Sequence, residues 1–332
     1  MEKIKKMKNN FKAMIVGCGN IGSGKSKFKD HSHAYNYKIN KDISLVCGVD
    51  NNINKLKNFK KIYKCPTEKK LQVALKKFNP NVVSVCTTDK SHFSIVKSII
   101  NSKSKPQLIF LEKPSFQNLY EYNYILKKLK KSKIEILVNH TRRFDKNFIS
   151  LKKKIKKNVF GKLISSHSFY YGGWLHNAIH LVDDLNFLIG TSFSILKVNK
   201  SVLNTNKNSI DVVLKDKKGL SKFLFTSIDD KYFQIFDTDL RFERKRININ
   251  NFGNKFYIQS KYKNKLNENV LSEQKSIINI SNNSMKNSIS MISKFLKLKK
   301  KSVLLNYRLQ DIKNTMKTMW EVQKKYENQL KK

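Results

Sequence analysis

The 332-residue sequence predicts two domains, an N-terminal α/β domain with a parallel sheet and an α+β domain built on an open, mostly antiparallel sheet. Three observations support this fold class. The chain is too long for one ordinary domain. Short apolar runs alternate with amphipathic stretches in the first part, whereas strand-like runs with polar turns dominate the later part. We therefore place the first domain at residues 1–140 and the second at residues 141–332.

The strands predicted for the first domain are continuous apolar runs, as expected for a parallel sheet that is buried on both faces. These runs are Ala13–Val16, Ser44–Val49, Val82–Cys86, Leu108–Leu111 and Ile134–Val138. Amphipathic periodicity between them predicts helices. These helices are Glu68–Phe78, Phe93–Asn101 and Leu119–Leu129.

The second domain begins with a mixed pattern and continues as a series of strands. Helices are predicted at Phe148–Lys157 and Asn177–Ile189, with a strand at Lys162–Tyr171 between them. The later strands are Ile195–Lys200, Ser209–Leu214, Lys222–Ser227, Gln234–Phe236 and Lys245–Ile249. The polar stretch Asn264–Asn287 is expected to be a loop or a partly ordered insertion. A final amphipathic helix spans Tyr307–Leu330, and one option is that it packs back on the first domain.

The formal net charge is +44, from 68 Lys and Arg against 24 Asp and Glu. The lysines are spread along the whole chain, which indicates solvated faces rather than a clustered nucleic-acid interface. No apolar run is long enough to cross a membrane, and the basic N-terminus leads into a strand pattern rather than a signal peptide. We expect a cytoplasmic protein with neither a nucleic-acid nor a membrane partner.

The cysteines give no sign of a metal or redox centre. Cys18, Cys47, Cys65 and Cys86 lie in the first hundred residues, and no pair has C-x-x-C spacing. Buried, reduced thiols are the simplest interpretation.

A glycine-rich loop directly follows the first strand. Gly17, Gly19 and Gly22 form the pattern G-x-G-x-x-G, which predicts a dinucleotide-binding Rossmann domain. The first glycine permits the tight turn, the second lets the backbone approach a pyrophosphate, and the third allows close packing of helix on strand. Asn20 and Ile21 lie between them, where the helix N-terminus offers backbone donors to the phosphates.

The same loop supports an alternative from another class. Gly19–Ser26 also matches the phosphate loop of NTPases, with Lys25 as its lysine and Glu112 as a possible magnesium-side acid. A phosphate loop begins where the strand ends, whereas here Gly17 and Cys18 intervene. The dinucleotide interpretation also fits the rest of the chain better.

Asp50, at the end of the second predicted strand, is the expected partner of the cofactor ribose. Its distance from the fingerprint is longer than usual, and an insertion over Ser23–His33 explains the difference. An acidic residue without an adjacent arginine favours NAD over NADP, because it would repel a 2′-phosphate. A simple turn aspartate is the alternative.

Four later segments follow the glycine loop in order. They are Val85-Cys-Thr-Thr-Asp-Lys-Ser-His92, Leu111-Glu-Lys-Pro114, Asn139-His-Thr-Arg-Arg-Phe-Asp145 and Gly172-Gly-Trp-Leu-His-Asn-Ala-Ile-His-Leu-Val-Asp183. Together they resemble the glucose–fructose oxidoreductase / inositol dehydrogenase / MocA (Gfo/Idh/MocA) family of NAD(P)-dependent oxidoreductases. The resemblance runs from about residue 12 to residue 190, and the final helix also fits.

The resemblance implies roles for individual residues. Thr87, Thr88, His92 and Glu112 would lie against the cofactor, with Thr88 in place of the family's usual proline. Lys113 would hydrogen-bond a substrate hydroxyl, and the bond before Pro114 is a candidate cis peptide. His180 would be the general acid/base. The alternatives are a surface lysine for Lys113 and a satisfied core histidine for His180.

The sequence departs from the family at His176, where polyol and inositol dehydrogenases carry an aspartate. Residues four apart share a helix face, so His176, His180 and Asp183 or Asp184 can line one wall, with His176 as a further catalytic candidate. A histidine brings no fixed negative charge, which leaves open an altered chemistry or a non-catalytic, regulatory dinucleotide-binding protein. A histidine metal site lacks an evident third ligand, so we expect none.

Substrate contacts are predicted from residue chemistry. Arg142 and Arg143 can bind an anionic group bidentately, although ion pairing at a domain boundary is equally compatible. Trp174, Asn177 and Asp183 are further candidates, and Trp174 could equally be core. We expect an NAD-dependent dehydrogenase or reductase for a sugar, polyol or nucleotide-linked sugar, and by family analogy a homo-oligomer.

Overall fold

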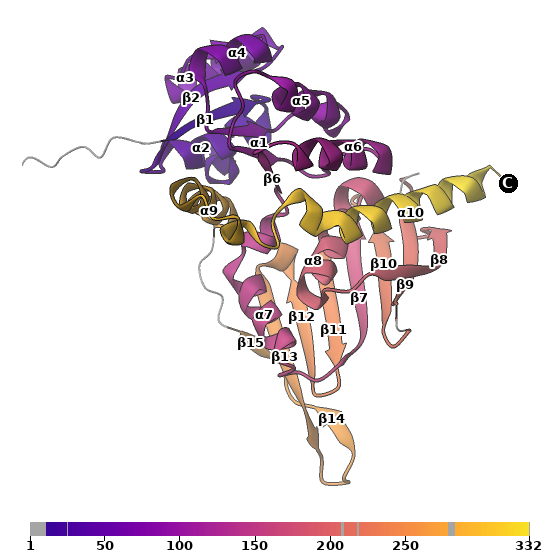
Figure 1. The fold of residues 1–332 in the computed structure, drawn as a ribbon. Coiled ribbons are helices and arrows are strands. Elements are labelled where there is room, and N and C mark those ends of the chain that lie inside the picture. Colours follow the sequence, from indigo (N-terminus) through magenta and orange to yellow (C-terminus); the bar gives the residue numbers. More distant parts are fainter. Residues whose placement is uncertain (1–10, 25, 207–208, 218, 278–282, 332) are drawn as a thin grey trace, which may run out of the picture. The chain divides into compact units, whose positions relative to one another are not determined.

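The computed structural model describes residues 11–24, 26–206, 209–217, 219–277 and 283–331 (Figure 1). The chain divides into two compact units, each of which is described by itself. The first unit comprises residues 1–144 and 283–312, and the second comprises residues 145–282 and 313–332. In the part of the chain that is described, no helix has both the length and the apolarity needed to cross a membrane.

The first unit contains a six-stranded sheet in the order β3-β2-β1-β4-β5-β6. Its strands are β1 (Phe11–Val16), β2 (Ile43–Val49), β3 (Thr67–Glu68), β4 (Val82–Val85), β5 (Leu108–Leu111) and β6 (Glu135–Val138). All neighbouring strands are parallel, which confirms the predicted parallel sheet. The strand order reverses between β1 and β4, and ligands bind at such switch points, outside the carboxyl ends of the strands.

Helices cover this sheet, and their caps explain where several of them begin. They are α1 (Asn20–Ser23), α2 (His33–Lys38), α3 (Ile53–Tyr63), α4 (Leu71–Phe78), α5 (Asp89–Asn101), α6 (Leu119–Lys130) and α9 (Ser284–Leu298). The side chains of Asn52, Asn118 and Asn283 accept hydrogen bonds from the first turns of α3, α6 and α9. Residues 24–32 separate α1 from α2.

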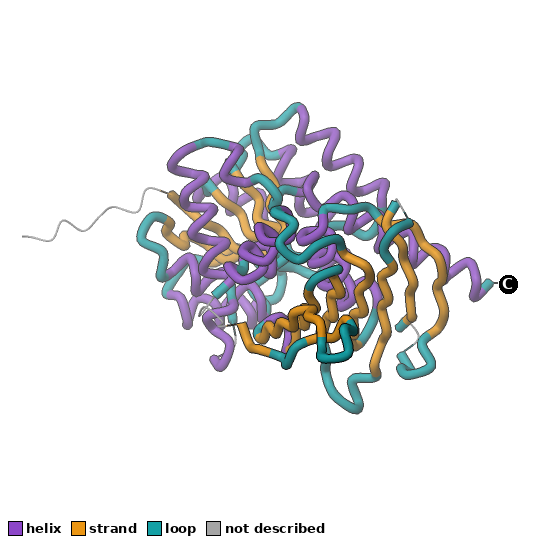
Figure 2. Tube along the Cα trace, turned by 90° about the horizontal axis from the view of Figure 1, so that it is seen from below, coloured by secondary structure: helices purple, strands orange, loops and turns teal. Residues whose placement is uncertain are grey.

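The second unit contains a nine-stranded sheet in the order β14-β13-β12-β11-β7-β10-β9-β8, with β15 paired to β13. In Figure 2, strands of this sheet run side by side in orange. Its strands are β7 (Leu163–Tyr171), β8 (Phe193–Lys200), β9 (Ile210–Asp216), β10 (Lys222–Ile228), β11 (Phe236–Phe242), β12 (Lys245–Asn250), β13 (Lys255–Lys263), β14 (Asn269–Leu271) and β15 (Lys275–Ile277). Only the described pair β7–β10 is parallel. The predicted open, mostly antiparallel sheet is therefore confirmed.

Three helices of the second unit contact one another or the sheet: α7 (Lys146–Lys156), α8 (Ile179–Ile189) and α10 (Lys313–Leu330). Burial alternates along β9, β10 and β11, so one sheet face forms the core and the other is partly exposed. A π-helical turn, Trp174–Ala178, precedes α8.

The structure differs from the sequence predictions in several places. Helices α2 and α3 have no counterpart among the predicted helices. Strand β11 spans Phe236–Phe242 rather than Gln234–Phe236. The stretch predicted as a loop from Asn264 to Asn287 contains β14, β15 and the start of α9, while residues 278–282 lie outside the described residues. The last helix belongs to the second unit, where it contacts α8 and β8, and it is α9 that returns to the first unit.

Candidate functional site

The glycine loop lies at the carboxyl end of β1, and its three glycines have different surroundings. A Cβ on Gly22 would lie 2.0 Å from the carbonyl oxygen of Gly17, and one on Gly17 would lie 2.7 Å from the backbone of Cys86 and Thr87. A Cβ on Gly19 would meet no atom within 4 Å. Gly17 and Gly22 are thus required by close packing. The space over Gly19 is open, and it suits the pyrophosphate of a dinucleotide.

Asp50 follows β2 and is tied to this loop. Its Oδ2 accepts a hydrogen bond from the Cys18 amide at 2.8 Å, and its Oδ1 accepts one from the Asn52 amide at 2.9 Å. The carboxylate is therefore held beside the glycine loop, at the carboxyl edge of the sheet where a ribose is bound in dinucleotide folds.

The structure contradicts the NTPase alternative. A phosphate loop leads into a helix that starts near its glycine–lysine pair. Here α1 starts at Asn20 and has ended by Ser23, and Gly24 has a φ of 83°. Lys25 lies outside the described residues. The adjacent β1 and β4 and the reversal of strand order between them are those of a dinucleotide fold.

Thr87, Thr88 and His92 lie where β4 passes into α5. Thr88 is the exposed N-cap residue of α5, and the Thr87 hydroxyl accepts a hydrogen bond from Ser91 at 2.9 Å. His92 is buried, with Nδ1 2.9 Å from the Pro114 carbonyl and Nε2 3.2 Å from the Thr87 carbonyl. His92 thus connects the loop after β4 with the loop after β5.

Glu112 directly follows β5 and takes part in a buried polar network. Its Oε1 is 2.8 Å from His33 Nε2 and accepts a hydrogen bond from Asn139 Nδ2 at 2.6 Å. Burial alone would raise the pKa of Glu112. The hydrogen bonds from His33 and Asn139, with the charges of His33 and Lys113, outweigh burial and hold that pKa below its usual value.

Lys113 follows Glu112 directly and is half-buried, and the peptide bond to Pro114 is cis as predicted. Burial lowers the pKa of Lys113 below its usual value. The negative charges of Glu112 and Asp89 oppose this shift, whereas the positive charge of Arg142 adds to it. A lysine in such surroundings gives up a proton more readily than a surface lysine.

The two predicted arginines differ in their surroundings. Arg143 is buried, and its Nη1 donates a hydrogen bond to the Asn306 carbonyl at 2.5 Å. Arg142 is half-buried and lies close enough to Lys113 to influence its pKa. The geometry therefore favours Arg142 over Arg143 as the anion-binding candidate.

In the second unit, the predicted histidines lie in and just after the π-helical turn. His176 is exposed, and His180 is half-buried with its ring 5.6 Å from the Phe236 ring in an edge contact. Asn177 Nδ2 donates to the Tyr171 carbonyl at 2.8 Å, which fixes the turn to the end of β7. Single π-turns inside helices are frequent at functional sites.

Two predicted substrate residues make core contacts in the second unit. Trp174 is fully buried, donates from Nε1 to the Met319 carbonyl at 3.1 Å, and packs edge-on against Phe225. Asp183 is also buried and accepts a hydrogen bond from Thr315 Oγ1 at 2.8 Å. These contacts fix α8 to α10, and they explain both residues without a ligand.

The cysteines fit the interpretation as reduced thiols. Cys18, Cys47 and Cys65 are buried and Cys86 is half-buried, and all are free. Burial raises the pKa of Cys47 to about 12 and that of Cys65 to about 11, so these thiols are poor nucleophiles. Within the described residues, no group of three or more His, Cys, Asp or Glu side chains could hold a metal ion.

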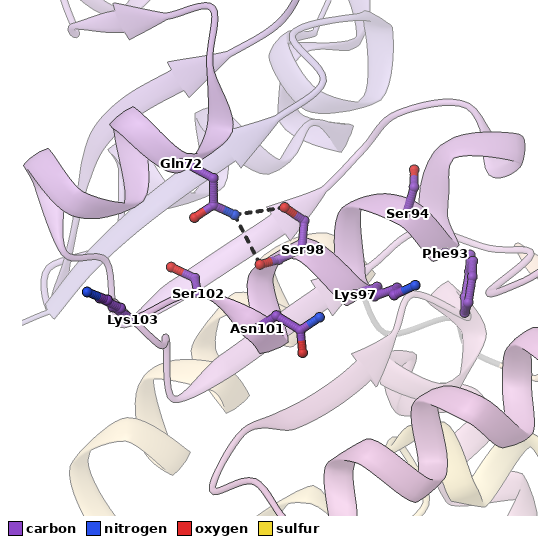
Figure 3. A pocket seen from close by; sticks show the side chains of 8 residues that line it. All are labelled: Gln72, Phe93, Ser94, Lys97, Ser98, Asn101, Ser102 and Lys103. Atoms are coloured by element: carbon purple, nitrogen blue, oxygen red, sulfur yellow. Dashed lines mark hydrogen bonds between the residues drawn. The ribbon is translucent and has the colours of Figure 1, made fainter.

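A separate hollow of about 560 Å³ lies between α4 and α5 (Figure 3). On one side, Gln72 Nε2 donates to the Ser98 carbonyl at 3.1 Å and to its hydroxyl at 2.7 Å. The hollow shares no residue with the predicted site, so it adds nothing to the dinucleotide interpretation.

Four residues of the Glu112 network were not predicted as site residues. His33 and Asn139 contact Glu112, Ser84 lies 3.0 Å from His33, and the Tyr37 hydroxyl lies 3.0 Å from Ser84. Ser84 was a visible signal, because a polar residue interrupts the apolar strand Val82–Val85. Asn139 was visible as part of a motif but was given no role.

Comparisons with known proteins agree with the first-unit geometry. Residues 11–140 match the GFO_IDH_MocA model, described as an oxidoreductase family with an NAD-binding Rossmann fold. The myo-inositol 2-dehydrogenase of Thermotoga maritima is 28% identical over 154 residues, which are 45% of this chain and 41% of that protein. Oxidoreductase P35 of Formosa agariphila is 27% identical over 153 residues, 46% of this chain and 44% of that protein. The alignments thus span less than half the length of these curated relatives.

Solved structures share the fold of the whole chain at low sequence identity. A putative NADPH-dependent oxidoreductase from Desulfitobacterium hafniense has a TM-score of 0.80 at 13% identity, covering 96% of each chain. A 3-ketoreductase from Actinomadura kijaniata, in complex with NADP and TDP-benzene, has a TM-score of 0.77 at 9% identity, covering 95% of this chain and 98% of that one. Over residues 11–140, this chain is similar to the Gfo/Idh/MocA oxidoreductase family.

Proposed function

We propose that this protein is an NAD(H)-dependent dehydrogenase or reductase that acts on a secondary alcohol or ketone of a sugar, polyol or nucleotide-linked sugar. The observation that carries the proposal is the glycine loop, closed by backbone contacts at Gly17 and Gly22 and open over Gly19. This arrangement suits a pyrophosphate. Residues Gly17–Gly22, with Asn20 and Ile21, would hold the pyrophosphate, and Asp50 the ribose.

NAD is proposed over NADP because of Asp50. Its carboxylate is fixed next to the glycine loop by the Cys18 amide and would repel a 2′-phosphate. Two of the structures with a similar fold are described with NADP or NADPH, so cofactor choice is a specific test of this proposal. Thr87, Thr88 and Glu112 complete the proposed cofactor contacts, and His92 supports them through its contacts with the loops after β4 and β5.

The chain's own residues would supply placement and proton transfer. Bound NAD supplies the hydride acceptor, and bound NADH the hydride donor. Lys113 would hydrogen-bond the reacting hydroxyl. Its charge is partly buried and partly compensated by nearby carboxylates, which suits this role. His180 would take the hydroxyl proton as the carbon is oxidised and return it in the reverse direction. His176 would assist from the preceding turn, and Asn177 would contact the substrate.

The proposed substrate class follows from the relatives and from Arg142. A myo-inositol dehydrogenase, a 3-ketoreductase solved with TDP-benzene and a UDP-N-acetylglucosamine 3-dehydrogenase are among the similar proteins. Arg142 offers a bidentate donor for a phosphate or carboxylate group. The homo-oligomer expected from the family resemblance belongs to the same proposal.

A regulatory protein that binds the dinucleotide without turning over a sugar is the second candidate. It is favoured by His176, which stands where relatives carry an aspartate and is exposed on its turn. Both candidates predict NADH binding, and only the enzyme predicts sugar-dependent turnover.

The first experiment is a titration of the protein with NADH, NADPH and ATP–magnesium, followed by nicotinamide fluorescence and calorimetry. Tight NADH binding with weaker NADPH binding is the expected result. ATP–magnesium binding without nicotinamide binding would overturn the proposal.

The catalytic assignment is tested by a matched histidine pair. In a panel of sugars, polyols and nucleotide-linked sugars, we expect His180→Ala to lower kcat roughly a hundredfold or more, because a lost acid/base group costs about this much. His176→Ala is expected to have a smaller effect. If His180→Ala turns over the same substrates at the wild-type rate, His180 is not the acid/base.

A further inference from the structure

A chain of buried hydrogen bonds approaches the Glu112–Lys113 segment from the interior of the first unit. His33 uses both ring nitrogens, with Nδ1 3.0 Å from Ser84 Oγ and Nε2 2.8 Å from Glu112 Oε1. The Tyr37 hydroxyl lies 3.0 Å from the same Ser84 oxygen. Tyr37, Ser84 and His33 have no exposed surface. The chain therefore has no outlet to water at its inner end, which argues against a proton relay.

We propose that His33 is a positioning residue that holds the Glu112 carboxylate, and with it a fixed negative charge, beside Lys113. The inference rests on the proposed function, in which Lys113 contacts the reacting hydroxyl. His33 itself touches neither the cofactor nor the substrate in this assignment.

The direction of the hydrogen bonds follows from the carboxylate. An ionised carboxylate only accepts, so His33 Nε2–H donates to Glu112 Oε1. His33 Nδ1 lies 3.0 Å from the Ser84 hydroxyl, and that hydroxyl lies 3.0 Å from the Tyr37 hydroxyl. Asn139 donates to the same Glu112 oxygen at 2.6 Å. Two donors on one buried oxygen favour the ionised form of Glu112.

The groups that face these residues show what the fixed charge does. Glu112 and Asp89 raise the pKa of Lys113, whereas burial and Arg142 lower it. The other groups near Glu112 and His33 are Cys86, Asn139, Ser84 and the Phe110 ring. Glu112 directly precedes Lys113 in the chain, and of the charged groups that act on the pKa of Lys113 its carboxylate has the largest effect. Loss of the His33 donor, which stabilises the Glu112 carboxylate, is therefore expected to change the pKa of Lys113.

A purely structural role makes a different prediction. The His33 ring lies 4.7 Å from the Phe110 ring, so the histidine also fills space in the core. If filling space were its whole purpose, two substitutions of similar polarity would disturb Lys113 equally. A Gln side chain can place its amide N–H near the position of Nε2, and a shorter Asn reaches only that of Nδ1.

The experiment compares His33→Gln with His33→Asn. Competitive acetylation with acetic anhydride across a pH series, read by mass spectrometry, measures the pKa of Lys113, with exposed Lys57 as an internal reference. We expect His33→Asn to lower the pKa of Lys113 and so to raise its acetylation at neutral pH roughly threefold or more. A fall of one pKa unit raises the fraction of free amine about tenfold. His33→Gln is expected to stay near the wild type, and Glu112→Gln to reproduce His33→Asn.

The inference is overturned if His33→Asn leaves the pKa of Lys113 unchanged or raises it, or if His33→Gln and His33→Asn shift it equally. A measurement on the wild-type protein tests the inference even when the variants fail to fold. Long-range proton–nitrogen spectra are expected to show a hydrogen on Nε2 of His33, and a ring with hydrogen on Nδ1 alone would also overturn the inference. None of these readouts needs NADH or a substrate. Failure of NADH binding would therefore reject the proposed function and leave this test intact.

Discussion

The glycine loop of the first unit and the histidine turn of the second unit are held in place by different parts of the chain. In the loop, main-chain atoms decide the geometry, because a Cβ at Gly22 would lie 2.0 Å from the Gly17 carbonyl oxygen. In the turn, side chains decide it. Asn177 binds the Tyr171 carbonyl, and His180 rests on the edge of the Phe236 ring. At Gly17 and Gly22 the loop therefore tolerates almost no change in residue type, whereas the turn can change chemistry while keeping its backbone.

This difference suits the proposed roles, in which the glycine loop binds the cofactor and the histidine turn acts on the substrate. A dinucleotide presents the same pyrophosphate to every relative, so a rigid main-chain cradle suffices for it. Substrates differ, and side-chain positions such as His176 can vary without loss of the fold. His176 is exposed, so its side chain can be changed with little effect on packing.

The largest effect is expected for Gly22→Ala, which tests whether the loop depends on its main-chain contacts. The added Cβ would overlap the Gly17 carbonyl, so the loop or β1 must move. We expect a loss of about 3 kcal/mol or more in the free energy of unfolding, at the upper end of overpacking effects, and loss of NADH binding. Chemical denaturation and a fluorescence titration measure both. Normal stability with normal binding would show that the loop is not confined as described.

Gly19→Ala is the matched control and separates packing from binding. Its Cβ meets no atom within 4 Å, so we expect the melting temperature of the wild type. The methyl group would occupy the space assigned to the pyrophosphate and raise the Kd for NADH roughly tenfold or more, about 1.4 kcal/mol. Wild-type affinity in this variant would mean that the pyrophosphate binds elsewhere.

The same contrast explains what the sequence could predict. Gly17 and Gly22 were recognisable because a main-chain constraint selects one residue type, and Gly19 completes the same spaced motif. The buried pair His33 and Ser84 was not, since the two are 51 residues apart and no local pattern links them. In the second unit, aromatic residues at the turn fit either a core or a ligand role, and only the structure places Trp174 fully in the core.

Element boundaries follow the same rule. The apolar run Leu108–Leu111 was predicted with its observed bounds, because a strand buried on both faces excludes polar residues. Strand β11 was misplaced because Asp237 and Asp239 alternate with buried residues on a half-exposed sheet, and this pattern resembles a polar turn. Helix α9 was missed although its buried positions, such as Met285, Ile289 and Ile292, have helical spacing.

A smaller effect is expected from Asp50→Asn, which tests the cofactor choice of the first unit. The amide oxygen can still accept from the Cys18 amide, so the loop keeps its support, while the negative charge is removed. We expect the ratio of NADH to NADPH affinity to fall roughly tenfold, because repulsion of the 2′-phosphate is lost. Asp42→Asn is the control, since Asp42 pairs with Lys297 and Ser293 on α9. An unchanged ratio in Asp50→Asn would remove Asp50 from the cofactor site.

The smallest effect concerns a side-chain anchor in the second unit. Asp229 ties the loop after β10 to the loop after β8 through Thr205, whose hydroxyl donates to Oδ2 at 2.6 Å. This hydrogen bond, with those from the Lys231 and Thr205 amides, lowers the pKa of Asp229 from 3.8 to about 2. The folded pKa lies below the unfolded value. The stabilisation is therefore complete above about pH 3.8 and is lost as the pH falls towards 2.

Asp229→Asn is accordingly expected to melt slightly below the wild type at pH 7. The difference should shrink between pH 4 and pH 2, as the wild-type carboxyl group takes up its proton. Asp230→Asn, one position along the loop and exposed, is the control and is expected to lack this pH dependence. A melting difference that persists unchanged at pH 2 would show that the lost interaction is not the ionised Asp229. The loops beside the histidine turn would then depend on packing rather than on this charge.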